Sequence, residues 1–543
     1  MRGLMMDRPL MIGSLLQYAA EYHGDTEIVS RTVEGPIHRY TYAEAEQRAK
    51  RLANALRRLG VGFGDRVATI AWNGFRHFEL YFAISGIGAV CHTINPRLFA
   101  DQLGYIVNHA EDKVLFVDLT FVPLAEKLAA HWPNVKHYVV MTDREHMPQT
   151  SLPNAHCYEV LLAGETAELV WPEFDENTAS SLCYTSGTTG NPKGALYTHR
   201  STVLHSYAIC AANAIGMSLR DAICPIVPMF HVNAWGIPYA AAMSGTKLVF
   251  PGAKLDGASL CELFEAEKVT ISSGVPTVWL GLLAYLDQTG KKPGALNRVT
   301  VGGSAVPPAM ISAFEDKYGI QCIHGWGMTE MSPVGTLAMP KAKLAGDREA
   351  QLATKAKQGF PLYGVEMKVV DPNGRAQPHD GVSRGELLVR GPWVVSAYYN
   401  DEEATAAALD EQGWFRTGDV STIDADGYMQ IVDRSKDVIK SGGEWISSID
   451  VENAAMGHPD VAEAAVIGLP HPKWAERPLL IIVAKPGQHP SKEAILGFLE
   501  TKIAKWQLPD DIVFVAEMPH GATGKVLKTR LREMFKDHHL PSA

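Results

Sequence analysis

Short apolar runs alternate with longer amphipathic stretches over residues 67–325. The apolar runs, which predict strands, lie at 67–71, 114–117, 223–227, 248–250 and 299–301. The amphipathic stretches, which predict helices, include 77–86, 258–267 and 307–317. Strands that alternate with helices in this way predict parallel sheets covered by helices, and therefore an α/β protein.

The pattern changes near residue 360. Between 360 and 432, short strands alternate with turns rich in Gly, Asp and Pro, such as Asp-Pro-Asn-Gly at 371–374 and Asp-Ala-Asp-Gly at 424–427. Such turns are typical of hairpins, so we expect a small, more antiparallel β subdomain there. After residue 436 a second α/β unit follows, with predicted helices at 448–456 and 492–504 and predicted strands at 464–467 and 479–484.

Composition and charge narrow the class of protein. The chain has 543 residues, of which 46% are hydrophobic and 20% charged, so it is globular and too long for one ordinary domain. Its formal net charge of −10 argues against a nucleic-acid partner. The chain has no apolar run long enough to span a membrane and no signal-peptide pattern. The seven cysteines are scattered and form no C-x-x-C pair, so we expect reduced thiols in a cytoplasmic protein.

A loop rich in glycine and hydroxyl groups follows the apolar residues 182–184. Its sequence, Thr-Ser-Gly-Thr-Thr-Gly-Asn-Pro-Lys-Gly over 185–194, leaves backbone N–H groups bare and adds hydroxyls and one lysine. This combination favours phosphate binding over a flexible surface loop. It is not a Walker A loop, because glycine follows the lysine where that motif needs Ser or Thr. The residues expected to hold phosphates are Thr185, Ser186, Gly187, Thr188, Thr189, Gly190 and Lys193.

Six further segments follow this loop along the chain. They read Met-Phe-His-Val-Asn-Ala-Trp at 229–235, Gly-Gly-Ser-Ala at 302–305, Gly-Trp-Gly-Met-Thr-Glu at 325–330, Trp-Phe-Arg-Thr-Gly-Asp at 414–419, Asp-Arg-Ser-Lys-Asp-Val-Ile-Lys at 433–440 and Gly-Ala-Thr-Gly-Lys at 521–525. Together with the loop they resemble the signatures of the adenylate-forming superfamily, which includes acyl-CoA synthetases, luciferases and the adenylation domains of peptide synthetases. The chain is most similar to bacterial medium- and long-chain fatty acyl-CoA synthetases and to methylthio-propionate-CoA ligases.

The resemblance implies a two-step reaction that uses ATP, Mg²⁺ and coenzyme A. A carboxylate attacks the α-phosphate of ATP to give an acyl-adenylate and pyrophosphate, and the thiol of CoA then displaces AMP. We expect an apolar fatty acid of medium chain length as the carboxylate. The alternatives are 3-methylthiopropionate as the acid, a carrier protein as the acceptor, or a nucleotide-binding protein without turnover. The resemblance also implies a homodimer formed through the N-terminal domain.

The resemblance assigns roles around the phosphates and the ribose. Glu330 is the expected Mg²⁺ ligand, and Thr329 is expected to bind the α-phosphate. Asp419 is the expected ribose ligand, because one carboxylate can accept from both hydroxyls. Arg434 is expected to contact the ribose or a phosphate, with an exposed Asp-Arg ion pair as the alternative.

The adenine base is expected between two glycine-containing segments. Gly302, Gly303 and Ser304 let the backbone approach one face of the base. Trp326 covers the other face, where the family more often has tyrosine, so a phenol hydrogen bond is lost. A buried core position is the alternative for this tryptophan.

Four residues are expected to be catalytic, namely Lys525, His231, Thr185 and Glu330. His231 is expected beside the acyl-adenylate, where adenylation domains that use amino acids have an aspartate, so an α-amino acid substrate is disfavoured. Trp235 matches a gate of the acyl tunnel. The residues expected to bind the acyl substrate are His231, Trp235, Gly325 and Gly327. A core histidine and a core tryptophan are the alternatives for the first two.

The family pattern divides the chain into residues 1–433, which bind ATP and the acid, a hinge at 434–437, and a mobile C-terminal domain at 438–543. Lys436 occupies the hinge position. Lys525 is the expected cation of the first step, and Lys440 is linked to the second step. Rotation of the C-terminal domain would exchange Lys525 for the loop 442–447, so that one site catalyses both half-reactions.

We therefore predict an α/β fold with a large N-terminal domain, a small β subdomain and a small mobile α+β C-terminal domain.

Overall fold

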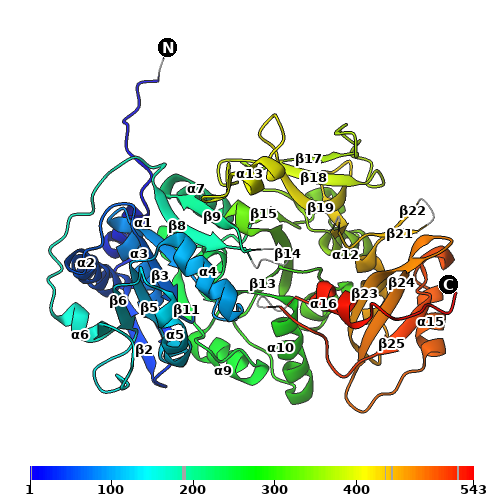
Figure 1. Ribbon diagram of the computed structural model, residues 1–543, viewed down its shortest axis with the longest axis horizontal. Helices are drawn as coiled ribbons and strands as arrows, with labels where there is room; N and C mark the ends of the chain where they lie inside the picture. Colours follow the sequence, from blue (N-terminus) through cyan, green and yellow to red (C-terminus); the bar gives the residue numbers. More distant parts are fainter. Residues whose placement is uncertain (2, 186–190, 435, 442–443, 522–524, 543) are drawn as a thin grey trace.

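The computed structural model describes residues 1–543 except 2, 186–190, 435, 442–443, 522–524 and 543. Figure 1 shows a large part, coloured blue to yellow, beside a smaller orange and red part formed by the C-terminal residues. The predicted α/β fold with a separate C-terminal unit is confirmed.

The first sheet of the large part is mostly parallel. It is antiparallel only at its two edges, where β1 pairs with β2 and where β14, β15 and β16 pair in sequence. In spatial order its strands are β16 (Phe360–Pro361), β15 (Val334–Leu337), β14 (Gln321–Gly327), β13 (Arg298–Val301), β12 (Ile271–Gly274), β10 (Ala222–Pro225), β11 (Lys247–Phe250), β1 (Glu27–Arg31) and β2 (Ile37–Thr41).

The second sheet is parallel except for its last pair, β8 and β9, which is antiparallel. In spatial order its strands are β7 (Ala155–Cys157), β6 (His137–Val140), β5 (Val114–Val117), β3 (Arg66–Ile70), β4 (Val90–Thr93), β8 (Ala179–Tyr184) and β9 (Gly194–Thr198). The turn between β8 and β9 is the loop predicted to bind phosphates.

Helices fill the space between the two sheets and cover their outer faces. All residues of α3 (Phe75–Gly86) are buried, and the helix contacts β1 of the first sheet and β4 and β8 of the second. A helix between two sheets has no solvent face, so its charged residues Arg76 and Glu79 are buried in ion pairs, with Glu159 and Arg48 respectively. The other helices of the large part are α1 (Ile12–Tyr22), α2 (Tyr42–Arg58), α4 (Ala100–Ala110), α5 (Val122–Leu128), α6 (Tyr158–Ala163), α7 (His199–Cys210), α8 (Ile237–Ser244), α9 (Gly257–Glu267), α10 (Pro276–Thr289), α11 (Pro308–Ser312) and α12 (Arg348–Ala356).

Residues 366–434 form the antiparallel subdomain that the turn pattern predicts. Its strands are β17 (Glu366–Val370), β18 (Gly385–Arg390), β19 (Phe415–Ile423) and β20 (Met429–Arg434), and α13 (Glu402–Ala408) lies between β18 and β19. In the first predicted turn, the carboxylate of Asp371 accepts from the backbone N–H groups of Asn373 and Arg375. Such bonds stabilise tight turns.

The C-terminal part has its own sheet and its own buried clusters, so it can pack as a unit. Its strands are β21 (Ile439–Ser441), β22 (Glu444–Ile446), β23 (Val461–His471), β24 (Ala475–Ala484) and β25 (Asp511–Phe514), and its helices are α14 (Ser448–Met456), α15 (Lys492–Glu500) and α16 (Lys528–Met534). The boundary at 434–437 stays a prediction; its first residue, Arg434, is the last residue of β20.

Candidate active site

The candidate residues gather where parallel strands of the first sheet end. The segment after β10 carries His231 and Trp235, Gly302 follows β13, and β14 leads into Glu330. The carboxyl ends of parallel strands commonly form the binding edge of open α/β sheets. The β8–β9 turn of the second sheet and the strands β19 and β20 add the remaining groups.

The two ends of the predicted phosphate loop are tied together. The N–H of Thr185 donates to the carbonyl of Lys193 at 2.9 Å, and the N–H of Lys193 donates to Oγ1 of Thr185 at 3.0 Å. These bonds extend the β8–β9 ladder and hold the base of the loop. The predicted phosphate ligands Ser186, Gly187, Thr188, Thr189 and Gly190 lie outside the described residues.

Glu330 and Lys193 both contact Tyr398. The hydroxyl of Tyr398 donates to Oε1 of Glu330 at 2.7 Å, and Nζ of Lys193 lies 5.0 Å from the centre of the Tyr398 ring. Burial raises the pKa of Glu330, while the Tyr398 hydrogen bond and the charges of Arg434 and Lys193 act in the opposite direction. The carboxylate is therefore buried but surrounded by groups that favour its charged form. Its neighbour Thr329 is also buried, and its carbonyl accepts from the hydroxyl of Tyr197 at 2.5 Å.

Asp419 has a partner on each carboxylate oxygen. The indole Nε1 of Trp326 donates to Oδ2 at 3.0 Å, and Nε of Arg434 lies 2.8 Å from Oδ1. Asp419 and Arg434 are also opposite each other in the β19–β20 ladder. The loss of a phenol hydrogen bond at this position stays a prediction, but the indole N–H supplies a different hydrogen bond, to Asp419.

One of the predicted glycines, Gly302, lies against both Gly325 and Trp235. A Cβ at Gly302 would lie 2.9 Å from the carbonyl oxygen of Gly325 and 3.1 Å from Cη2 of Trp235. The predicted base-binding and acyl-binding residues thus meet at one place, and a side chain at Gly302 would push the indole away. Gly303 has a φ of +85°, which suits glycine. Ser304 is exposed beside it.

Gly327 has a structural reason to lack a side chain. A Cβ there would lie 2.0 Å from the carbonyl oxygen of Pro333, because the β14–β15 ladder shifts register at this residue. This close backbone approach explains the glycine without a substrate, and its role in acyl binding stays a prediction.

The segment that carries Trp235 is a left-handed turn. Val232, Asn233, Ala234 and Trp235 have φ between 44° and 58°, and Gly236 follows with a φ of 75°. Each such residue other than glycine costs about 1–2 kcal/mol, so the surroundings must hold the turn. Asn233 supplies an anchor, since its Nδ2 donates to Oγ of Ser181 on β8 at 2.9 Å. The sequence pattern does not predict this turn.

His231 lies just before the turn, beside a small pocket that also reaches the phosphate loop. The pocket is lined in part by Thr93, Leu98, Thr185, Phe230 and His231. Burial, followed by the positive charge of Lys525, lowers the pKa of His231 to about 4. The imidazole is therefore neutral at neutral pH and can accept or donate a hydrogen bond without adding a charge.

Lys525 lies close enough to these groups to interact with their charges. Desolvation, followed by the charge of Arg434, lowers the pKa of Lys525 to about 8, whereas Asp419 and Glu330 act in the opposite direction. Lys525 keeps access to solvent, yet enough protein surrounds its ammonium to disfavour the charge. Its carbonyl accepts from the N–H of Gly521 at 2.7 Å.

The remaining two predicted lysines lie just before β21 (Ile439–Ser441) and within it. The N–H of Lys440, on β21, donates to Glu476 of the neighbouring strand at 2.8 Å. Lys436 is exposed, and its carbonyl accepts from Arg532 of α16 at 3.3 Å. Arg532 also pairs with Asp437 at 2.7 Å, so α16 contacts the predicted hinge directly.

No helix in the described part of the chain is long and apolar enough to cross a membrane. Those residues also contain no group of three or more His, Cys, Asp or Glu side chains that could hold a metal ion. An ion carried by nucleotide phosphates needs no such group, since Mg²⁺ commonly binds through one or two carboxylates together with phosphates and water.

Relatives and solved structures match nearly the full chain. A 3-methylmercaptopropionyl-CoA ligase of Ruegeria lacuscaerulensis is 53% identical over 540 residues, which cover 99% of each chain. A medium-chain-fatty-acid–CoA ligase of Ectopseudomonas oleovorans is 50% identical over 544 residues, which cover 100% of this chain and 99% of that one. The crystal structure of the anthranilate CoA ligase AuaEII in complex with anthranoyl-AMP superposes with a TM-score of 0.87 at 27% identity, covering 99% of both chains.

The family assignment agrees with these similarities. Residues 16–399 match the AMP-binding enzyme family, and residues 450–525 match the AMP-binding enzyme C-terminal domain. The first match alone covers more than half of the chain. The chain therefore belongs to the AMP-binding enzyme family and is an AMP-forming acid–thiol ligase that uses ATP and CoA.

Proposed function

We propose that the protein activates an apolar fatty acid of medium chain length with ATP and transfers the acyl group to CoA. The observation that carries the choice of an apolar acid is the contact between Trp235 and Gly302, next to a neutral His231. Trp235 also packs against the main hydrophobic core. The surface formed by Trp235, Gly302 and the neutral His231 is apolar and carries no charge, so it favours an acid without a second charged group.

The first step needs cations around the attacking carboxylate and the phosphates, because both reactants are anionic. We infer that the loop from Thr185 to Lys193 holds the β- and γ-phosphates and that Lys525 bridges the carboxylate and the α-phosphate. Positioned charges of this kind lower the barrier without having to reorganise during the reaction. Asp419, held by Arg434, would accept from the ribose hydroxyls.

Glu330 fits a magnesium ligand. Its carboxylate is buried, its pKa is raised by that burial, and a cation at this position would relieve the cost. The Tyr398 hydrogen bond uses Oε1, and a metal contact through a single oxygen needs only Oε2. Bound Mg²⁺ would neutralise phosphate charge and orient the leaving pyrophosphate.

The second step needs different neighbours around the acyl-adenylate. We infer that the C-terminal part turns at Lys436 after pyrophosphate leaves, which withdraws Lys525 and brings Lys440 and the loop 442–447 toward the site. The separate buried clusters of the C-terminal part support such a motion, because the part can move without opening its own core.

We also expect the protein to form a homodimer, which light scattering would test, and to use Mg²⁺ as its metal.

A thioether acid is the second candidate substrate. The 53% identical relative is a 3-methylmercaptopropionyl-CoA ligase, and the 50% identical relative acts on medium-chain fatty acids, so identity does not separate the two. A carrier protein as the acceptor is the third possibility.

A substrate series tests the proposal. Purified enzyme with ATP, CoA and Mg²⁺ would receive straight-chain acids from butyrate to palmitate and, in parallel, 3-methylthiopropionate. Pyrophosphate release reports adenylation, and chromatography of the CoA thioester reports transfer. The proposal expects kcat/KM to peak at a medium-chain acid. A peak at 3-methylthiopropionate would establish the second candidate, and adenylation without a CoA thioester would favour a carrier protein.

A further inference from the structure

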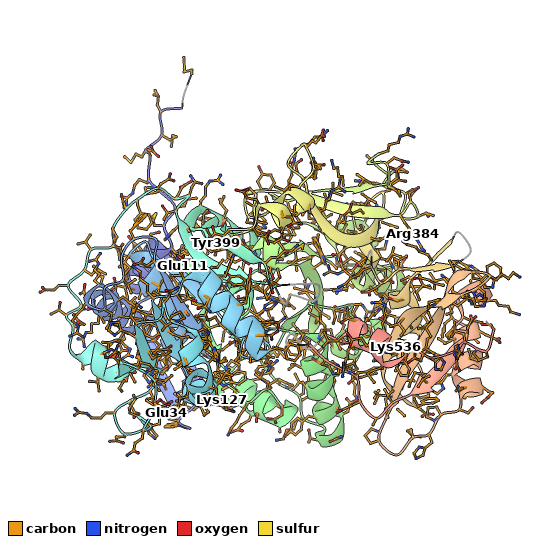
Figure 2. The ribbon with its side chains drawn as sticks, in the orientation of Figure 1. Glu34, Glu111, Lys127, Arg384, Tyr399 and Lys536 are labelled. Carbon is orange, nitrogen blue, oxygen red and sulfur yellow. The ribbon has the colours of Figure 1, made fainter. Side chains whose placement is uncertain are left out.

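A short segment joins the two motifs that surround the phosphates. Residues 393–399, called the strap here, lie between β18 and α13. At one end the N–H of Val395 donates to the carbonyl of Glu330 at 2.8 Å. At the other end the N–H of Tyr399, which is labelled in Figure 2, donates to the carbonyl of Gly194, the first residue of β9, also at 2.8 Å. The strap is therefore attached both to the Thr-Glu motif and to the end of the phosphate loop.

Tyr398 lies between these two attachments and is itself fixed. Its N–H donates to Oγ1 of Thr405 on α13 at 2.9 Å, and its ring packs edge-on against Phe415 with 6.1 Å between ring centres. Only 8% of the residue is exposed. A buried side chain with a fixed backbone and a packed ring keeps one orientation, so it can hold other groups in place.

The two functional groups of this side chain contact the two charged residues. The hydroxyl donates to Glu330 at 2.7 Å, and the face of the ring receives the ammonium of Lys193 at 5.0 Å. An ammonium is attracted to an aromatic face. In the described part of the chain, Lys193 and Glu330 form no ion pair within 4.0 Å. The charge of Lys193 still acts to lower the pKa of Glu330, against the larger effect of burial. A direct pair would neutralise both groups before a nucleotide arrives.

We propose that Tyr398 is a positioning residue for adenylation, which orients the Glu330 carboxylate with its hydroxyl and keeps the Lys193 ammonium apart from that carboxylate with its ring. The proposal rests on the proposed function, in which Glu330 binds Mg²⁺ and Lys193 binds phosphate. It assigns the strap a role in the first half-reaction and none in the transfer to CoA.

Two neighbouring tyrosines allow a matched test. Tyr398→Phe removes the hydroxyl and keeps the ring, whereas Tyr399→Phe removes a hydroxyl from the same strap that does not contact Glu330. The primary readout is the binding of a non-hydrolysable ATP analogue, measured by calorimetry over a series of Mg²⁺ concentrations without any acid present. We expect Tyr398→Phe to raise the Mg²⁺ concentration needed for half-maximal binding by about 10- to 100-fold, the loss expected for a hydrogen bond to a buried charge. Tyr399→Phe should match the wild type.

Activity and a second variant separate the ring from the hydroxyl. Pyrophosphate release should slow for Tyr398→Phe, while thioester formation from supplied acyl-adenylate should not change. Tyr398→Leu also removes the ring, so we expect weaker analogue binding even at saturating Mg²⁺. In a Glu330→Gln background, Tyr398→Phe should cause little further loss in the Mg²⁺ series, because both changes act on one interaction.

Other outcomes would overturn the proposal. Equal behaviour of Tyr398→Phe and Tyr399→Phe would show that the hydroxyl is irrelevant. Equal losses in both half-reactions, with a lower melting temperature, would show that Tyr398 only supports the fold. If Tyr398→Phe folds poorly, Tyr398→Leu can be combined with Glu330→Gln instead. Losses of analogue binding that simply add in this double variant would show that Tyr398 and Glu330 do not act through one interaction. By contrast, a wild-type enzyme that neither binds the analogue nor releases pyrophosphate would refute the proposed function itself.

Discussion

The indole Nε1 of Trp326 donates a hydrogen bond to Oδ2 of Asp419 at 3.0 Å, across 93 residues of chain. Arg434 holds the other carboxylate oxygen, so the orientation of Asp419 is set from both sides. A fixed carboxylate loses less entropy when it accepts from two ribose hydroxyls than a rotating one. Tryptophan at this position thus supplies a donor as well as an aromatic surface.

Replacement of Trp326 by phenylalanine tests this donor. Trp326→Phe keeps an aromatic ring but leaves Oδ2 of Asp419 without its partner, so we expect the KM for ATP to rise by about tenfold, with a smaller effect on the KM for the acid. Trp171→Phe is the control, because Trp171 also loses a buried indole hydrogen bond, to the carboxylate of Glu46 at 3.3 Å. Equal changes in the KM for ATP in both variants would mean that packing alone is responsible.

Removal of Lys525 should separate the two half-reactions. Lys525→Ala deletes a cation that lies near Asp419, Glu330 and His231, so adenylation should slow by about 10² to 10³. Thioester formation from supplied acyl-adenylate should change little. Single-turnover measurements of each half-reaction check this expectation, which equal losses in both would contradict.

The pH dependence of adenylation should report the same lysine. Because desolvation by the surrounding protein and the charge of Arg434 lower the pKa of Lys525 to about 8, the ammonium loses its proton as the pH rises through that value. The charged form carries the proposed role, so kcat/KM for adenylation should fall above pH 8 and stay level between about pH 6 and 7. The neutral His231 should add no titration in that lower range.

A lysine-to-arginine change provides the control for this profile. Lys525→Arg carries a charge that persists throughout the range, so its alkaline decline should disappear even if the overall rate is lower. An alkaline decline that remains in Lys525→Arg would assign the titration to another group.

Trp235 should influence which acids are used more than how ATP binds. Trp235→Ala removes the indole that lies against Gly302, and if Trp235 gates the acyl tunnel as proposed, this would lengthen the space open to the acyl chain. Longer acids should therefore gain in kcat/KM relative to shorter ones, while the KM for ATP should change little. Parallel losses for all chain lengths, together with a lower melting temperature, would favour a packing role alone.

The predicted hinge can be held in one backbone state. Lys436→Pro fixes φ near −65° and restricts the preceding residue, so we expect acyl-adenylate and pyrophosphate to form while acyl-CoA output falls much further. Lys436→Ala is the control, because it removes the side chain and leaves the backbone free. The hinge would lie elsewhere if both half-reactions slowed together or if neither changed.

Much of the fold follows from local patterns. The helices expected at 77–86 and 258–267 are α3 (Phe75–Gly86) and α9 (Gly257–Glu267), within two residues at each end. The helix expected at 492–504 stops at Glu500, and the one expected at 307–317 is α11 followed by a π-helical turn. Hydrophobic periodicity locates such elements but does not define their ends, which depend on local hydrogen bonding.

Local sequence patterns predict only part of the candidate site. The left-handed turn at Val232–Gly236 has no periodic signal, because its conformation depends on the anchor between Asn233 and Ser181, 52 residues away. Tyr398 is 68 residues from Glu330 and belongs to none of the recognised motifs. A tyrosine pair between two elements gives no indication of the carboxylate that one of its hydroxyls will contact.

The sequence by itself determined the alternation of strands and helices, the glycine and hydroxyl chemistry of the phosphate loop, and the set of charged residues available to a nucleotide. These properties depend on neighbouring residues and on side-chain type. Only the tertiary structure decided that Trp326 would hold Asp419 and that Tyr398 would contact both Glu330 and Lys193. Strand order and packing bring such groups together over dozens of residues, and no local rule of backbone conformation carries that information.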